Sequence, residues 1–185
     1  MARRHRRLDR ESIAADPRCY GEFKTWIRRR LASASSVVVS VLIPDFFMFV
    51  CGNGDGEGWQ SVTLRVPSGS GVGIRDLFVD PTRGLRALAD LVRTRMLRTN
   101  RWVRSVAHND DPYVRRSYLR GFNPTARNYR YFALTIRGLV IGFPTEQVTP
   151  PPAGRVRTTV PYSAIRTYLS DLGNALVAGV RSPRR

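Results

Sequence analysis

Apolar residues recur at helical spacing in three parts of the chain, which predicts three helices. Asp16-Pro17 and Asp80-Pro81 open the first two, because aspartate caps a helix and proline is tolerated at its first position. We expect these helices over about 17–32 and 82–98, and a third from Pro161 that Gly173 is placed to end. Their apolar stripes are Tyr20, Phe23, Ile27 and Leu31; Leu85, Leu88, Val92 and Met96; and Ile165, Leu169 and Leu172.

Elsewhere the apolar residues alternate with a period of two, which predicts strands with one buried face. We expect one strand with Val37, Val39, Val41 and Ile43 buried, then a turn at Pro44-Asp45 and a short strand from Phe46 to Cys51. A further strand should follow, with Val62, Leu64 and Val66 buried and Ser61, Thr63 and Arg65 facing water.

Three more strands are expected in the last third of the chain. Tyr131 to Phe143 reads as a hairpin that turns at Arg137-Gly138, and Arg155 to Val160 as a last strand after the loop of Pro150 to Pro152. The order α-β-β-β-α-β-β-β-α lacks the alternation of a parallel sheet. We therefore predict an α+β fold, an antiparallel sheet with about three packed helices, as a single domain over 16–180. Residues 1–15 and 181–185 read as basic tails, the first of them disordered.

The composition is ordinary for a globular protein except in the sign of its charge. Hydrophobic residues make up 42% and charged residues 24% of 185 residues, but 31 basic residues face 14 acidic ones, for a net charge of +17. Lys24 is the only lysine, so the skew toward arginine reads partly as the codon habit of a GC-rich genome. A field of this sign favours anionic partners, whether nucleic acid, an acidic lipid surface or an acidic wall polymer.

The N-terminal segment, the longest apolar run and the two cysteines bear on the location and redox state of the protein. The N-terminal arginines are not followed by the apolar segment of a signal peptide, and the longest apolar run is interrupted by Pro44 and Asp45 and is too short to span a bilayer. We expect no transmembrane segment, and a cytoplasmic location if Met1 is the true start. Cys19 and Cys51 can form one disulfide or remain two thiols.

Three segments partly match motifs for metal binding or catalysis. Residues 51–58, CGNGDGEG, begin like an EF-hand loop, but position 12 is Leu64 where the motif needs a bidentate glutamate, so a connection between strands is expected. His108 could act as a general base with Asp110 or Asp111, but HNDDP is more typical of a capping turn. PSGSG at 67–71 lacks the first glycine of a nucleophile elbow. We predict no cofactor and no metal, and lean against an enzyme.

Residues 113–132 interleave aromatic rings with arginines, which is the combination that single-stranded nucleic acids and other polyanions need. Some of these rings are equally expected in a core, and the arginines on an ordinary solvated surface. The residues predicted for an anionic-partner surface are Arg115, Arg116, Tyr118, Arg120, Arg127 and Arg130.

Residues 121–172 carry an ordered set of elements that resembles the RsiV-like domain of lysozyme-sensing anti-sigma factors and mycobacterial secreted immunogenic antigens. GIRDLFVDPTRGLRALADLV at 73–92 extends the likeness upstream, to about 73–172. The matching elements are Gly121 and Pro124, Asn128-Tyr129 and Phe132, Gly138, Phe143, Pro152-Ala153-Gly154, Val160-Pro161 and Ser163-Ala164-Ile165.

The resemblance implies a compact α+β domain that binds or senses a partner outside the membrane, lysozyme being the best characterised partner of the family. It supplies no catalytic residue, and the partner of this chain, a protein or a cell-wall-associated molecule, stays open. Two alternatives also stay open, a cationic nucleic-acid or anionic-polymer binding protein and a secreted esterase-like hydrolase. Relatives usually have a Gly-Gly-x-His hairpin where this chain has Gly52 to Gly58. They also have further strands and an export segment before the first helix, which we do not expect within the given residues.

Overall fold

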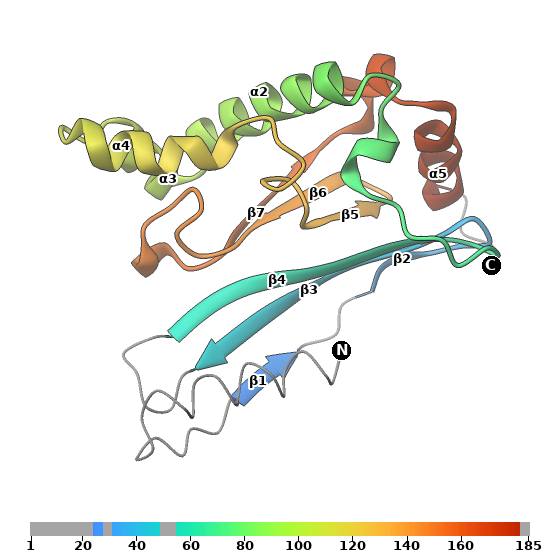
Figure 1. The fold of residues 1–185 in the computed structure, drawn as a ribbon, viewed down its shortest axis with the longest axis horizontal. Coiled ribbons are helices and arrows are strands. Elements are labelled where there is room, and N and C mark those ends of the chain that lie inside the picture. Colours follow the sequence, from blue (N-terminus) through green and yellow to red (C-terminus); the bar gives the residue numbers. More distant parts are fainter. Residues whose placement is uncertain (1–23, 28–30, 49–54, 182–185) are drawn as a thin grey trace.

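The protein is an α+β domain built in three layers (Figure 1), as the sequence predicts. A computed structural model describes residues 24–27, 31–48 and 55–181. A helical layer covers one face of a three-stranded antiparallel sheet, and a four-stranded antiparallel sheet lies against the other face. The elements are β1 (Lys24–Ile27), β2 (Leu31–Ala34), β3 (Val38–Met48), β4 (Asp55–Arg65), α2 (Pro81–Thr99), α3 (Arg101–Ala107), α4 (Pro112–Leu119), β5 (Phe132–Thr135), β6 (Gly138–Phe143), β7 (Val156–Val160) and α5 (Asp171–Arg181). Two sheets thus replace the single sheet that was expected.

The four-stranded sheet is organised around β3. β4 pairs with β3 over its whole length, from Val38 opposite Arg65 to Met48 opposite Asp55. β2 and β1 pair with different segments of β3, the first ending at Val41 and the second beginning at Asp45.

The predicted first helix is wrong where the structure describes it, because residues 24–27 and 31–34 are strands. Helical spacing is a weak guide when a long strand offers a free edge, since tertiary pairing readily overrides local preference. The rest of the predicted helix, like Cys19, Cys51 and Asn53, lies outside the described residues. The predicted C-terminal tail also begins one residue too early, because Arg181 is the last residue of α5.

The predicted turn at Pro44-Asp45 is also wrong, because β3 runs straight through it. Proline cannot donate to a ladder hydrogen bond and is tolerated in a sheet where no neighbour needs its N–H. Pro44 lies between the segment of β3 that pairs with β2 and the segment that pairs with β1, so it interrupts neither pairing.

The alternation in β3 and β4 is real, but the buried face is the opposite of the predicted one. Val38, Ser40 and Leu42 are buried, as is Thr63, whereas Val62 is 40% exposed. The reason is a polar contact that the apolar pattern cannot show. The hydroxyls of Ser40 and Thr63 are 2.7 Å apart, and the Ser40 Oγ accepts the backbone N–H of Leu134 from the neighbouring sheet at 2.9 Å.

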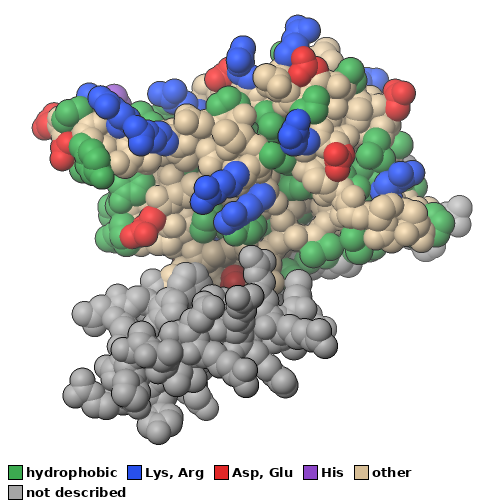
Figure 2. Space-filling view, in the orientation of Figure 1, with side chains coloured by type: hydrophobic (Ala, Val, Ile, Leu, Met, Phe, Trp, Pro, Cys, Tyr) green, Lys and Arg blue, Asp and Glu red, His purple; other side chains and the backbone are tan. Residues whose placement is uncertain are grey.

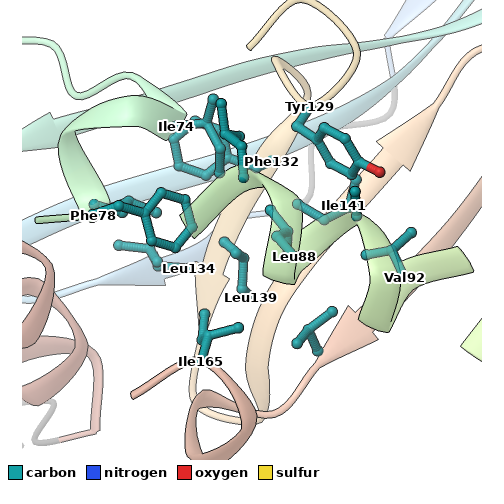
Figure 3. Close-up of a cluster of buried hydrophobic side chains, with 14 of the residues drawn as sticks. Ile74, Phe78, Leu88, Val92, Tyr129, Phe132, Leu134, Leu139, Ile141 and Ile165 are labelled. Atoms are coloured by element: carbon teal, nitrogen blue, oxygen red, sulfur yellow. The ribbon is translucent and has the colours of Figure 1, made fainter. Parts of the chain in front are cut away.

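The second predicted helix is confirmed as α2, which covers the three-stranded sheet. The Asp80 carboxylate accepts the N–H groups of Thr82 and Arg83, and Pro81 occupies the first turn. The apolar stripe of α2 packs into the main core, where Leu88 and Val92 meet Leu139 and Ile141 of β6 (Figure 3).

The third predicted helix begins later than expected. After Pro161 the chain makes two 3-10 turns, Tyr162–Ala164 and Arg166–Tyr168, before α5 starts at Asp171. Gly173 does not end this helix but lies inside it. Glycine is needed at this position because a Cβ would collide with the carbonyl oxygen of Leu77. The start of α5 is fixed by Ser170, whose Oγ accepts the N–H of Gly173 and donates to the carbonyl oxygen of Asp76.

The predicted hairpin and last strand are confirmed as β5, β6 and β7. Thr135 pairs with Gly138 across a two-residue connection, and Gly138 has φ of 144°, a value that favours glycine. β6 lies between β5 and β7, so β5 and β7 are the two edges of this sheet.

Candidate anion-binding cleft

Two short helices, α3 and α4, follow α2 and are not anticipated by the sequence pattern. Each has a side-chain cap. Asn100 accepts the N–H groups of Trp102 and Val103, and Asp111 accepts those of Tyr113 and Val114. Seven and eight residues are too few to show a clear helical period, but Asn100, and Asp111 followed by Pro112, were the available signals.

The C-terminal end of α4 is fastened to the domain by the segment that carries the family resemblance. The side-chain Nδ2 of Asn128 donates to the carbonyl oxygens of Arg120 and Asn123, both at 3.0 Å. Gln147 Nε2 donates to the carbonyl oxygen of Gly121, where an added Cβ would collide with the Gln147 backbone. The matching residues Gly121 and Asn128 thus position α4.

A cleft of about 360 Å³ opens between α4 and α2. Its α4 wall is formed by residues three and four apart, which lie on one face of a helix. Arg93 of α2 closes the other side. The lining residues are Arg93, Pro112, Arg115, Arg116, Leu119, Arg120 and Asn123.

The cleft is cationic and has no acidic residue among those lining it. Arg115 is half-buried and its Nη1 donates to the carbonyl oxygen of Asn109 at 3.1 Å, which holds its guanidinium in place. Among the residues that the structure describes, the one ion pair joins Arg155 to Glu57 elsewhere in the fold. Figure 2 shows Lys and Arg side chains along this end of the helical layer, with Asp and Glu side chains at its tip. Four arginines therefore line one cleft, and none of its described lining residues is acidic.

The structure brings together only half of the predicted anionic-partner surface. Arg115, Arg116 and Arg120 line the cleft, whereas Tyr118, Arg127 and Arg130 are not among its lining residues. Arg127 is exposed in the turn that follows α4, and the Arg130 guanidinium lies 4.6 Å from the ring centroid of Tyr131. Of the interleaved rings, Phe122 and Tyr129 are buried in the core and Tyr113 is 78% exposed.

Arg93 is the one cleft arginine that the sequence did not reveal. It lies more than 20 positions before Arg115, on the polar side of the α2 stripe. Only the fold of α3 and α4 back along α2 places it opposite Arg116 and Arg120.

The candidate catalytic and metal-binding residues have other roles in the structure. Asp111 caps α4, and His108 is an exposed residue at the end of α3. Glu57 belongs to β4, accepts the N–H of Arg155 at 3.1 Å and pairs with its guanidinium at 3.3 Å. Within the described part of the chain, no group of three or more His, Cys, Asp or Glu side chains could hold a metal ion. Nor does any described helix have the length and apolar character of a membrane span.

The molecule is thus an α+β domain with an arginine-lined cleft between α2 and α4. Residues 75–163 match a family model described as "Protein of unknown function (DUF3298)". No curated protein matches the chain.

Two solved structures, both of DUF3298 family proteins, share the fold. One is from Bacteroides fragilis NCTC 9343, with a TM-score of 0.63 and 14% identity over 92% of this chain. The other is from Pseudomonas aeruginosa PAO1, with a TM-score of 0.58 and 10% identity over 95% of this chain. This chain spans 65% of the Bacteroides protein and 71% of the Pseudomonas protein. The match and the two structures connect this chain with DUF3298 proteins in both sequence and fold.

Proposed function

We propose that this protein is a non-enzymatic binding domain that recognises an anionic partner through the arginine cleft. One observation carries the proposal: Arg93 of α2, Arg115 and Arg116 of α4, and Arg120 just after α4 line one cleft whose described lining residues include no carboxylate. Guanidinium groups bind phosphate, sulfate and carboxylate oxygens through paired N–H donors, so this arrangement suits a chain of such groups. A net charge of +17 would also draw a polyanion toward the domain.

The RsiV-like resemblance supports the same class of function, a domain that senses a partner outside the membrane. We propose an extracytoplasmic location on that basis, with an acidic cell-wall-associated polymer as the partner that best fits the charge. Fractionation of native cells tests the location. Recovery of the protein in the envelope or medium is expected, and recovery only in the cytosol would overturn this part of the proposal.

Binding to long-chain inorganic polyphosphate tests the cleft directly. We expect the variant R93Q/R116Q/R120Q to bind at least about 10-fold more weakly near 150 mM salt, because three phosphate contacts are lost. Arg115 is left unchanged since it also bonds to Asn109. The matched control is R75Q/R137Q/R166Q, which removes three exposed arginines and the same net charge outside the cleft. Equal weakening in both variants would show that net charge alone binds the polymer.

Single-stranded nucleic acid is the second candidate ligand, and Tyr113 is the observation that favours it. Its side chain is 78% exposed and lies three residues before Arg116 on α4, so a base could stack on the ring beside the cleft. Tyr113→Ala should weaken binding of a single-stranded oligonucleotide about 5-fold or more, while leaving polyphosphate binding unchanged. An unchanged oligonucleotide affinity would exclude base stacking at this position.

A further inference from the structure

The outer edge of β7 carries backbone groups that have no hydrogen-bond partner in the described chain. Among the described strands, β7 pairs with β6 alone, from Phe143 opposite Val156 to Leu139 opposite Val160, so it is an edge strand. Which of its amides point outward can be read from the register, because backbone groups alternate between the two sides of a strand.

The hydrogen bonds of β6 show which backbone groups of β7 point outward. The N–H of Gly142 donates to the carbonyl oxygen of Tyr131, on the β5 side. Leu139, Ile141 and Phe143 must then direct their backbone groups toward β7, where they face Val160, Thr158 and Val156. The N–H and C=O groups of Arg157 and Thr159 therefore point away from the sheet, and none of the hydrogen bonds in the described structure uses them.

The same edge already donates a hydrogen bond to an oxygen from outside the sheet. The N–H of Arg155, two residues before Arg157 and on the same side of the chain, donates to the Glu57 carboxylate at 3.1 Å. Arg157 and Thr159 continue this row toward the end of β7, where Arg157 is exposed and Thr159 half-buried.

An open groove of about 310 Å³ lies beside this end of β7, on the side that faces α2. Val160, Pro161 and Ala164 form one wall and Leu91 and Thr94 of α2 form the other. Arg95 and Arg98 also line the groove, together with one acidic residue, Asp90. The groove thus combines an apolar lining with two cations.

The two faces of β7 differ in a way that selects an occupant. Val160 and Thr158 are buried on the face that packs toward α2, whereas the Arg157 side chain lies on the opposite face and is exposed. A strand added to this edge would direct alternate side chains to those two faces. Side chains toward α2 would meet the apolar groove, and those on the other face would lie beside Arg157.

We propose that the edge of β7 binds an extended segment of a partner protein in which acidic and apolar residues alternate. The segment adds a strand to the β5-β6-β7 sheet through the backbone groups of Arg157 and Thr159. Its apolar side chains enter the groove beside Leu91 and Val160, and its carboxylates face Arg157. A basic segment is disfavoured by Arg95, Arg98 and Arg157, and a polysaccharide lacks the regularly spaced amides that an edge strand bonds.

This site is separate from the arginine cleft. Of the α2 residues, Arg93 lines the cleft and Leu91 the groove, and the two sets of lining residues have no member in common. The inference therefore stands independently of the proposed polyanion binding, and R93Q/R116Q/R120Q should leave it intact.

A blocked eight-residue peptide that alternates Glu and Val tests the inference, with a Lys-Val peptide of the same length as the charge control. In amide hydrogen exchange, the Arg157 and Thr159 amides should exchange freely in the full chain and become at least about 10-fold slower with the Glu-Val peptide. The proposal would be overturned if millimolar Glu-Val peptide did not slow the exchange of these two amides, or slowed only amides elsewhere on the domain. Equal slowing by the Lys-Val peptide would also overturn it.

A pair of variants at one position isolates the backbone contact. Arg157→Pro removes an N–H that the sheet does not use, whereas Arg157→Ala keeps it and removes the same charge. We expect Arg157→Pro to bind the Glu-Val peptide at least about 5-fold more weakly than Arg157→Ala, because one hydrogen bond is lost. Equal affinities would exclude strand addition. If Arg157→Pro does not fold, the amide hydrogen exchange of the unaltered protein with the Glu-Val peptide tests strand addition instead.

Discussion

Tyr129 shows how a single residue can have a role other than the one its sequence neighbours indicate. It lies in the arginine-rich segment 113–132, yet it is fully buried and donates from its hydroxyl to the carbonyl oxygen of Phe122 at 3.0 Å. Its ring packs edge-on against Phe143, with centroids 5.9 Å apart. Burial, and secondarily the charge of Asp90, raise the pKa of the Tyr129 hydroxyl well above its usual value.

The raised pKa of Tyr129 predicts a loss of stability in alkali. Because the folded state favours the neutral hydroxyl, Tyr129 contributes fully to the free energy of unfolding below the pKa of an unfolded tyrosine, about 10. This contribution is lost as the pH rises above that value. Tyr129→Phe should cost about 1 kcal/mol at pH 7 through the lost hydrogen bond, yet make the unfolding free energy less sensitive to pH above about 10. Urea unfolding from pH 8 to 11 measures both effects, and parallel pH profiles for the two proteins would contradict the assignment.

At the scale of elements, serine side chains of one sheet satisfy the edge of the other. β5 is an edge strand, and the outward backbone groups of Leu134 in β5 form hydrogen bonds with two of these serines, Ser33 and Ser40. Its N–H donates to the Ser40 Oγ at 2.9 Å, and its carbonyl oxygen accepts from the Ser33 Oγ at 2.8 Å. Buried polar groups need such partners, so Ser40 and Thr63 occupy the inward face in place of larger apolar residues.

Removing the Ser40 hydroxyl should therefore destabilise the domain more than the loss of one small buried group would by itself. Ser40→Ala leaves the buried N–H of Leu134 without a partner, at a cost of about 1–3 kcal/mol in the free energy of unfolding. The exposed Ser68 provides the control, where Ser68→Ala should change stability by no more than about 0.5 kcal/mol. Urea titrations compare the two, and similar stabilities would show that the Leu134 N–H finds another partner.

At the scale of the whole molecule, Trp59 fastens the two sheets to each other. From β4 its ring rests against Gly142 of β6, where an added Cβ would meet the indole, and its Nε1 donates to the carbonyl oxygen of Phe143 at 3.1 Å. The Arg155 guanidinium lies 5.5 Å from the ring centroid and pairs with Glu57. Side chains from both sheets thus meet around one indole.

Trp59→Ala should loosen the contact between the sheets and cost about 3–5 kcal/mol, as is usual for a buried tryptophan. The half-buried Trp102 of α3 is a suitable control, and Trp102→Ala should cost less. Amide hydrogen exchange would show whether β4 and β6 lose protection together in Trp59→Ala. Loss confined to β4 would mean that the second sheet is stable without this contact.

The sequence by itself determined the α+β class, α2, the hairpin of β5 and β6, and β7. These elements depend on local signals, such as the Asp80-Pro81 cap and the glycine at 138, whose physical effect does not require a distant partner. The sequence also identified three of the four cleft arginines, because Arg115, Arg116 and Arg120 are close together along the chain.

Only the tertiary structure decided the strands at 24–34, the buried face of β3, and the meeting of Arg93 with α4. Each depends on a partner far away in the sequence: the free edge of β3, the Leu134 N–H that Ser40 bonds, and the return of α4 along α2. The outward amides of Arg157 and Thr159 belong to the same group, since a strand has a free edge only in relation to the sheet around it. Pairing and burial are properties of the assembled fold, and a pattern along one chain carries no record of which side of a strand will be covered.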